Sequence, residues 1–472
     1  MPIQPPRGVL DPGLRGLTIG LILTVTLVAF EALAVATALP AAEDDLGDIY
    51  LYGWTFSAFL LASLIGIAFA GERSDISGPA LPFVLGLVLF AVGLLVGGLA
   101  QSMLILVGAR AIQGLGAGAI PAVAYVSIGR AYPDSLRPRM LALFATAWVL
   151  PGLVGPGVAG VVAEYLSWRI VFLGIIPFVA GAALLALPGL RSVGPPATPG
   201  HRRSLIPMSI LLALGAGLAL TGPTLGSAPV AVPCIIVGLL IAVVPLKRLL
   251  PAGTLVARRG LPAAVAGTAI LNFAFFGADA FIPLMLTEVR GQTTVVAGIV
   301  ITITTLTWTG GSWVMERLGH RVGRGRLIRL GLGLIIVGTI MIIPVTGSAP
   351  LWLAGVAWAI AGAGIGLAYP GFSLAALSTT TEGSEGAAAT SVKTAEFLAA
   401  AGGAGIGGAI VGAGDAGGWR PESLAINFAL MALVCIPGLY AAVRLVFPSS
   451  PGEVHPSSVQ VSKPSPAGTI GQ

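Results

Sequence analysis

Three charged residues, Glu31, Arg110 and Asp279, interrupt long apolar stretches of the sequence. A charged side chain within hydrocarbon costs roughly 3 kcal/mol on insertion scales, so such residues usually serve a function. A carboxylate whose surroundings change between two states can take up and release a proton, whereas an arginine stays charged throughout. The residues therefore indicate a membrane protein that moves protons. We expect Glu31 or Asp279 to be the exchanging acid and Arg110 to influence it.

The same three residues are predicted to lie at similar depths. At about 1.5 Å per helical residue, Glu31 is roughly 15 Å from the outer end of its helix, and Arg110 and Asp279 are each roughly 12 Å from theirs. We therefore expect one layer of charge near the middle of the membrane. Purely structural roles remain open, since Glu31 could be a buried hydrogen-bonding group and Arg110 could only fasten its helix to a neighbour.

The composition excludes a water-soluble fold. The 472 residues are 56% hydrophobic and 9% charged, whereas soluble proteins carry about 25% charged residues. The apolar runs are about 20 residues long, which is the length of a spanning helix rather than of a barrel strand. No P-loop sequence occurs and the three histidines fall in polar segments. We therefore expect an all-α membrane protein that is not an enzyme, with no cofactor and no intramembrane metal.

Apolar runs predict fourteen transmembrane helices, arranged as two six-helix bundles with two extra linking helices. The spans are expected near 17–41, 49–71, 79–100, 103–130, 140–165, 169–190, 206–225, 229–246, 261–287, 293–315, 327–346, 350–377, 389–413 and 423–447. The predicted domains are a cytoplasmic segment (1–16), an N-terminal bundle (17–190), a linker with two extra helices (191–260), a C-terminal bundle (261–447) and a disordered cytoplasmic tail (448–472). The weakest predictions are the two linking helices.

The basic residues predict the orientation. With the N-terminus in the cytoplasm, 21 of the 25 Lys and Arg residues fall inside, Arg169, Arg290 and Arg420 fall outside, and Arg110 lies within a span. Cytoplasmic loops are enriched in Lys and Arg, so both termini are expected in the cytoplasm. The protein itself is expected in the cell (plasma or inner) membrane. The net charge of +6 then meets anionic lipid, and no nucleic-acid partner is indicated.

Three sequence motifs resemble those of the major facilitator superfamily, specifically its fourteen-helix drug:proton antiporters. The fourth span contains R-A-I-Q-G-L-G-A-G (110–118), similar to the family's R-x-x-Q-G-x-G. The fifth contains P-G-L-V-G-P-G-V-A-G (151–160), which resembles the antiporter motif, and the first ends in F-E-A-L-A-V-A-T-A-L-P (30–40). The loop after the second span departs from the family pattern, because Ile76, Pro79 and Ala80 replace its basic positions.

The resemblance implies proton-coupled efflux by alternating access, with Glu31, Arg110 and Asp279 on helices that border a central cavity. It also implies a set of residues for conformational change, namely Asp75, Gly78, Gly114, Gly118, Gly155, Pro156 and Gly160. The candidate cavity residues are polar or aromatic, namely Gln113, Asn272, Phe276, Trp148, Trp308 and Tyr369. Lys393 and Glu396 form a pair three residues apart, for which a structural role is expected.

The expected substrates are small amphipathic or cationic drug-like molecules. A cavity that is acidic, aromatic and aliphatic suits such compounds, whereas few Asn or Gln residues occur within the spans to bind sugars or peptides. The expected partners are therefore a small molecule, protons and the lipid bilayer, and the chain is expected to be a monomer. The alternatives are a lipid, glycolipid or specific metabolite exporter on the same fold, and, from another class, a non-transporting sensor or a membrane-embedded enzyme.

Overall fold

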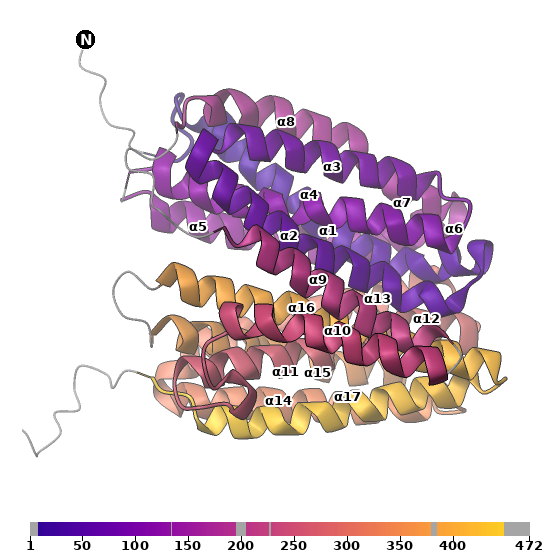
Figure 1. The fold of residues 1–472 in the computed structure, drawn as a ribbon. Coiled ribbons are helices and arrows are strands. Elements are labelled where there is room, and N and C mark those ends of the chain that lie inside the picture. Colours follow the sequence, from indigo (N-terminus) through magenta and orange to yellow (C-terminus); the bar gives the residue numbers. More distant parts are fainter. Residues whose placement is uncertain (1–7, 134, 195–203, 226–227, 379–384, 448–472) are drawn as a thin grey trace, which may run out of the picture.

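The described part of the protein is helical throughout. A computed structural model describes residues 8–133, 135–194, 204–225, 228–378 and 385–447. The predicted tail (448–472) and the first seven residues of the predicted N-terminal segment (1–16) lie outside the described residues. The chain runs back and forth along one common direction as a bundle of long helices (Figure 1). The expected all-α class is therefore confirmed.

Twelve helical stretches of the described residues are long and apolar enough to cross a membrane, so the expected fourteen are not confirmed. The expected span 140–165 is divided between α5 (Arg137–Thr146) and α6 (Val149–Tyr165). Pro151 has no amide to donate to the carbonyl of residue 147, which favours a break at this point. With 17 residues, α6 is shorter than the twelve candidate stretches.

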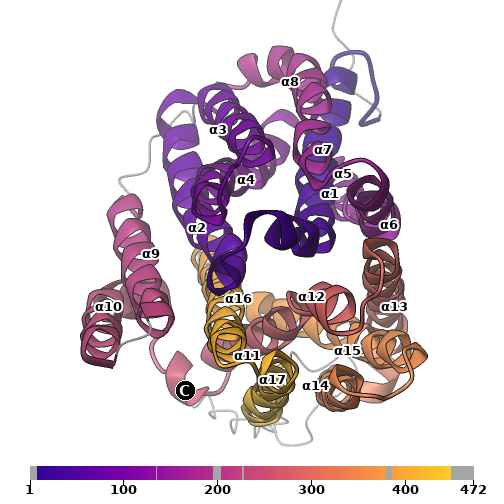
Figure 2. The ribbon, with the colours of Figure 1, turned by 90° about the vertical axis from the view of Figure 1, so that its right-hand side faces the viewer.

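The expected spans 293–315 and 327–346 fall within one stretch, Thr294–Thr346. A π-helical turn at Gly319–Gly323 joins α13 (Thr294–Leu318) to α14 (Arg324–Ile342). The π-helical turn ends at Gly323, whose φ of +95° lies outside the helical range, so the chain turns there between the two helices. The two helices accordingly stand at separate places when the bundle is seen from its end (Figure 2).

The helices form two groups with a separate pair at the side (Figure 2). The first group contains α1 (Arg15–Leu46), α2 (Tyr52–Ser77), α3 (Ala80–Gly98), α4 (Met103–Ala131), α5, α6, α7 (Trp168–Leu173) and α8 (Ile176–Arg191). The second contains α11 (Leu261–Asp279), α12 (Ile282–Leu284), α13, α14, α15 (Trp352–Ser378), α16 (Glu385–Ala416) and α17 (Arg420–Val443). We call them the N-terminal and C-terminal halves.

The pair at the side consists of α9 (Ile206–Thr221) and α10 (Ala228–Leu249). Leu212 and Leu220 of α9 belong to one buried apolar cluster with Leu61 and Leu64 of α2. Many side chains of α10 are exposed, including Leu239 and Leu240. Exposed aliphatic residues are expected where a helix faces lipid, so this pair covers α2 and presents an apolar surface outward.

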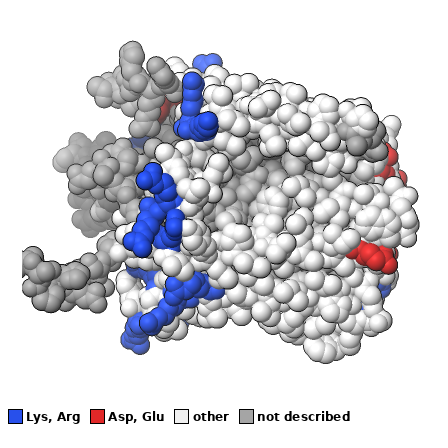
Figure 3. Space-filling model, turned by 60° about the horizontal axis from the view of Figure 1, so that its bottom comes forward, with Lys and Arg blue, Asp and Glu red and all other residues white. Residues whose placement is uncertain are grey.

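Charged side chains gather at the two ends of the bundle (Figure 3). Arg73, Arg137 and Arg324 are in segments at one end, which we call the basic end. Asp45 near the end of α1 and Glu288 in the turn Met285–Val289 that follows α12 lie at the opposite end, which we call the acidic end. On the face drawn in Figure 3, the surface between the ends is nearly free of charge, as expected of a surface that contacts hydrocarbon.

Glycines let α4 pack against the backbone of α2. A Cβ added at Gly114 would lie 2.2 Å from the Phe59 carbonyl oxygen, and one at Gly118 would lie 2.2 Å from that of Ser63. Small residues at such positions allow helices in membranes to approach closely. The Ser63 hydroxyl also donates a hydrogen bond to the carbonyl of Gly114 at 3.1 Å. This contact fixes the helix that carries Arg110.

Replacing Gly114 by alanine is expected to destabilise the protein by about 2 kcal/mol, because the added methyl would force α2 and α4 apart. Gly108 on the same helix provides the matched control, since a Cβ there meets nothing within 4 Å. Thermal unfolding in detergent should show a lower midpoint for Gly114→Ala and an unchanged or higher midpoint for Gly108→Ala. Equal midpoints would contradict the packing argument.

Candidate functional site

Glu31 and Arg110 form an ion pair inside the N-terminal half. Nη1 of Arg110 donates to Oε1 of Glu31, which joins α4 to α1. Both side chains are buried. A buried ion pair is retained only where its geometry and further hydrogen bonds offset the desolvation of both charges. These two sequence-predicted residues therefore act as one unit.

Arg110 is held by three further contacts from its own half. Nη1 also donates to Oε1 of Gln113 at 2.7 Å, and Nε donates to the carbonyl of Thr55 at 3.2 Å. The guanidinium carbon lies 4.1 Å from the centre of the Phe59 ring, a cation–π geometry. Gln113 is one turn beyond Arg110 on α4, so the two side chains lie on the same face of the helix. The guanidinium is thus fixed in position.

One oxygen of the Glu31 carboxylate has no hydrogen-bond partner among the described residues. Among the described residues, Oε2 of Glu31 and Nε2 of Gln113 are buried without a hydrogen-bond partner. Buried polar atoms nearly always have a partner, so an exception requires an explanation. A proton on Oε2 or a bound water would satisfy this oxygen.

Asp279 lies in a different network in the C-terminal half. It is the last residue of α11, and Nε1 of Trp358 on α15 donates to its Oδ1 at 2.7 Å. No hydrogen bond or ion pair between described residues joins it to Glu31 or Arg110. The structure thus brings two of the three charged residues together and holds the third separately.

An aromatic cluster surrounds the Asp279 network. Trp358 stacks on Phe275 with centroids 5.8 Å apart, and Phe275 contacts Trp308 at 5.7 Å. Trp308 in turn contacts Phe276 at 6.2 Å and Tyr369 at 6.1 Å. Three predicted cavity residues, Phe276, Trp308 and Tyr369, are therefore neighbours on α11, α13 and α15.

The three other predicted cavity residues have no ring contact with this cluster, and Gln113 belongs to the Arg110 network described above. Asn272 is buried, and its Nδ2 donates to the Thr268 carbonyl at 2.8 Å while its Oδ1 has no partner among the described residues. Trp148 is 45% exposed and directly precedes α6. Sequence patterns place such residues in a span but do not tell which face of the helix they occupy.

Sequence reasoning missed a polar cluster formed by Tyr369, Lys393 and Glu396. The Tyr369 hydroxyl donates to Oε2 of Glu396 at 2.9 Å. Nζ of Lys393 donates to the same Oε2 at 2.9 Å and to the Tyr369 oxygen at 3.2 Å. The spacing of Lys393 and Glu396 indicated their pairing, but nothing in the sequence connected them to Tyr369 on another helix.

Asp75 and Gly78 lie where α2 ends, at the basic end of the bundle. Nη2 of Arg130 donates to Oδ1 of Asp75 at 2.6 Å, and Nη1 donates to the Ser74 carbonyl at 2.9 Å. Gly78 ends the helix with φ at +81°, a value that favours glycine. The ion pair joins the ends of α2 and α4, although basic residues are missing from the loop that follows.

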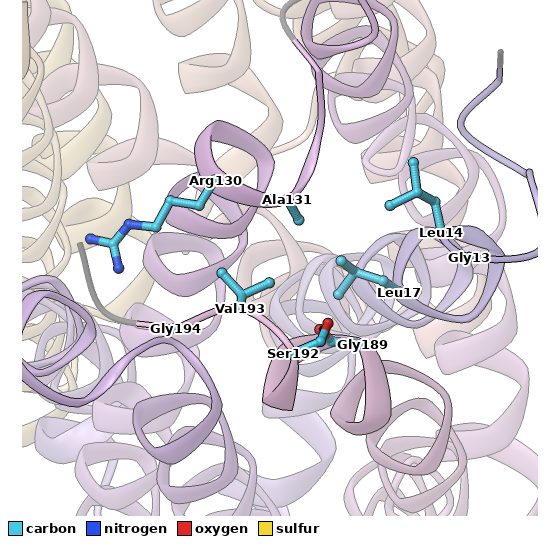
Figure 4. Close-up of a pocket in the computed structure, with 9 residues that line it drawn as sticks. All are labelled: Gly13, Leu14, Leu17, Arg130, Ala131, Gly189, Ser192, Val193 and Gly194. Carbon is cyan, nitrogen blue, oxygen red and sulfur yellow. The ribbon is translucent and has the colours of Figure 1, made fainter. Parts of the chain in front are cut away.

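A cavity of about 520 Å³ opens beside this ion pair. It lies between the beginning of α1 and the ends of α4 and α8, and Leu14, Leu17, Ala131 and Val193 are among the residues that line it (Figure 4). The guanidinium of Arg130 points away from Leu14 and Leu17. Arg130 therefore serves the contact with α2 rather than the interior of this cavity.

The sequence resemblance implies transport, and on that expectation replacing Asp75 by asparagine should slow transport without unfolding the protein. Half-exposed ion pairs contribute less than about 1 kcal/mol, and the side chains of Arg130 and Asp75 are 23% and 49% exposed. Loss of the charge would loosen α2 from α4, and the resemblance implies that Asp75 takes part in conformational change. Initial transport rates compared with thermal unfolding midpoints test this, and an unchanged rate would contradict a gating role for Asp75.

The glycines of α6 form part of the contact between the two halves. A Cβ at Gly160 would lie 2.8 Å from the Thr294 carbonyl oxygen, and one at Gly298 of α13 would lie 2.4 Å from that of Pro156. Gly155 has more room, since its nearest neighbour would be Phe30 at 3.5 Å. The α6 motif therefore serves as a close-packed seam against α13.

Hydrogen bonds between the halves lie toward the acidic end. The hydroxyls of Tyr52 and Ser57 donate to the carbonyls of Ala280 and Ala401 at 3.2 and 2.8 Å. At the same end, the amide of Thr294 donates to Oε2 of Glu164 at 2.9 Å, where a carboxylate also suits the helix N-terminus. The halves are thus fastened together at their acidic ends.

The sequence pattern of the Major Facilitator Superfamily matches residues 21–404. The chain belongs to this superfamily. The expected family is therefore confirmed at the level of the superfamily, and the chain is a multi-pass membrane transporter. The expected membership of the fourteen-helix drug:proton antiporter subfamily is not confirmed.

Two bacterial relatives are similar to this chain. A probable multidrug-efflux transporter of Mycobacterium tuberculosis is 28% identical over 418 residues, which cover 83% of this chain and 87% of the relative. Multidrug resistance protein 3 of Bacillus subtilis is 32% identical over 162 residues, which cover 34% of this chain and 32% of the relative.

Solved structures of the superfamily share the fold. A bacterial homologue of the human lysosomal transporter Spinster, in an inward-facing and occupied conformation, matches with a TM-score of 0.64 at 15% identity, covering 92% of this chain and 98% of that one. The POT family transporter PepTSo matches with a TM-score of 0.66 at 12% identity, covering 90% and 96%. At these identities the likeness concerns the fold alone.

Proposed function

We propose that the protein exports small amphipathic or cationic drug-like molecules in exchange for protons, as a fourteen-helix drug:proton antiporter does. The observation that carries this proposal is the buried Glu31–Arg110 pair with its unpartnered carboxylate oxygen. Charged residues inside membrane spans commonly mark proton pathways. The multidrug-efflux relative from M. tuberculosis supports the substrate class.

Proton exchange would act through the Glu31–Arg110 pair. A proton on Glu31 neutralises the acceptor of Arg110 and weakens the contact between α1 and α4, and release of the proton restores it. Each proton that descends a potential of 100 mV supplies about 2.3 kcal/mol. This is enough to bias two conformations of similar energy.

Asp279 would provide a second acid that meets the substrate. It lies at the end of α11 beside Trp358 and the aromatic cluster. A carboxylate flanked by aromatic faces suits a lipophilic cation, because both attract positive charge. A substrate cation and a proton would then compete for Asp279.

Alternating access would use the contacts between the halves. The seam of α6 and α13 and the hydrogen bonds of Tyr52 and Ser57 lie at the acidic end, and would open as the basic end closes. Such rocking of two halves around a central site is the usual mechanism of transporters built from repeats. We propose that the two halves act as the domains 17–190 and 261–447, with 191–260 as their linker.

The charge distribution supports the proposed orientation. On the face drawn in Figure 3, Lys and Arg residues gather at the basic end, which would face the cytoplasm according to the positive-inside rule. Both termini would then be cytoplasmic in the cell membrane, with the protein working as a monomer.

Transport into proteoliposomes with an acidic interior tests the proposal. We expect a lipophilic cation such as ethidium to accumulate while the pH gradient persists and to leave when a protonophore collapses it. Protein-free liposomes correct for passive partition. Accumulation that is the same with and without protein would contradict export of this class of substrate.

A further inference from the structure

The Tyr369–Lys393–Glu396 cluster carries an inference beyond proton exchange. All three side chains belong to the C-terminal half, with Tyr369 on α15 and the other two on α16. Lys393 is the ninth residue of α16 and lies about 12 Å along the helix from its first residue. The candidate span of this helix begins at Ala388, so Lys393 lies about 8 Å inside the basic end of the span, where the ammonium can still reach polar surroundings.

Lys393 lies on the face of α16 that is turned toward the N-terminal half. A Cβ at Gly53 of α2 would lie 2.3 Å from the Ala404 carbonyl oxygen and 2.8 Å from the Cα of Gly408. Lys393 precedes Ala404 by eleven residues, about three helical turns, so both lie on one face of the helix. At the level of Ala404 this face is covered by α2.

At the level of Lys393 the same face is not covered. The Lys393 side chain is 46% exposed, whereas that of Glu396 is 18% exposed. An ammonium has three donor hydrogens, and the contacts to Glu396 and Tyr369 use two of them. The third has no hydrogen-bond partner among the described residues, so it can bind a ligand.

The aromatic neighbours of Lys393 provide an apolar surface beside its charge. Nζ of Lys393 lies 6.0 Å from the centre of the Tyr369 ring. Tyr369 contacts Trp308, which contacts Phe276. A ligand with an acidic group at Lys393 could therefore lay an apolar portion along these rings, and each contact would be favourable.

We propose that Lys393, positioned by Glu396 and Tyr369, binds the acidic group of anionic amphipathic substrates. The proposal rests on the proposed function as an exporter of amphipathic molecules and extends its substrates to compounds with a carboxylate or similar anion. The Lys393–Glu396 pair is neutral as a whole, so an incoming anion replaces part of the contact with Glu396 rather than meeting an isolated charge.

A matched pair of probes tests the proposal. The anionic probe is 11-(dansylamino)undecanoic acid and the neutral probe is its methyl ester. Binding to the full chain in nanodiscs of neutral lipid is followed by energy transfer from tryptophan to the dansyl group, with empty nanodiscs as the blank. We expect the acid to bind about tenfold more tightly than the ester.

The variants Lys393→Gln and Lys393→Arg separate charge from packing. The glutamine variant should bind the acid and the ester within about twofold of each other, while its affinity for the ester stays that of the wild type. The arginine variant should keep most of the preference, because it keeps the charge. Unchanged ester binding reports that the glutamine variant is folded.

Equal affinities for acid and ester in the wild type would overturn the proposal, as would a preference that persists in Lys393→Gln or a failure of both probes to bind. The same preparations report on the proposed function separately, through proton flux triggered by a lipophilic cation. A missing proton flux together with a tenfold preference for the acid would refute antiport and leave the Lys393 site standing.

Discussion

Replacing Glu31 by glutamine should abolish substrate-triggered proton movement, with a fall on the order of tenfold or more. Glutamine is nearly isosteric with glutamate but does not titrate, so it removes proton exchange while keeping the volume. The substitution also leaves Arg110 buried without its ionic partner, which costs about 3–5 kcal/mol of stability. Proton flux and thermal unfolding must therefore be measured on the same protein.

The double variant Glu31→Gln/Arg110→Gln separates the two effects. Removing both charges eliminates the unpaired buried guanidinium, so this variant should unfold at a higher temperature than the single Glu31→Gln variant. Its proton flux should nevertheless stay at the level of the single variant. Recovery of flux along with stability would mean that Glu31 is only a structural partner of Arg110.

Replacing Asp279 by asparagine should lower proton-coupled transport of a lipophilic cation by a factor on the order of 10. The fold should be little affected, because the asparagine amide oxygen can still accept from Nε1 of Trp358. The exchange of a charged acceptor for a neutral one costs only about 1 kcal/mol. Initial rates of transport driven by a pH gradient measure the effect.

Trp358→Phe provides the control for Asp279. It removes the indole donor but keeps an aromatic ring against Phe275. If Asp279 acts through its charge, Trp358→Phe should transport far faster than Asp279→Asn. Equal losses in both variants would show that the hydrogen bond, and not the carboxylate, is what transport requires.

The fold class could be predicted from the sequence because hydrocarbon imposes simple rules. Apolar runs of about 20 residues identify spanning helices, and the motif around Arg110 and Gly114 identified the superfamily. The number of spans did not follow as directly, because the length of an apolar run does not show where a helix ends or breaks. The number of candidate spans differs from fourteen at two places. The turn at Gly319–Gly323 joins two expected spans into one helical stretch, and α6 is too short to be counted.

The candidate site was predicted in its parts but not in its connections. A charge within a long apolar run marks Glu31, Arg110 and Asp279 individually, and the spacing of Arg110 and Gln113 places those two residues on one face of their helix. Contacts between distant helices depend on how the helices pack, which a single sequence does not specify. For this reason the separate Trp358 contact of Asp279 and the Tyr369 contact of Lys393 emerge only from the structure.

The packing partners of the glycines also could not be predicted from the sequence. Gly114, Gly118 and Gly160 were expected to serve conformational change, and the sequence could not tell this role from tight packing. All three face backbone atoms of a neighbouring helix. The partner of Gly160 lies in the other half, so this glycine is the one placed where the halves must separate.

The central claim, exchange of protons for substrate, is tested most directly by lumenal pH in proteoliposomes. With an imposed pH gradient, addition of a lipophilic cation should start proton movement through the wild-type protein. The same addition should have no effect on protein-free liposomes or on liposomes with the Glu31→Gln/Arg110→Gln variant. Folded wild-type protein that moves no protons with any compound of a lipophilic-cation panel would contradict antiport and favour an uncoupled carrier or a lipid exporter.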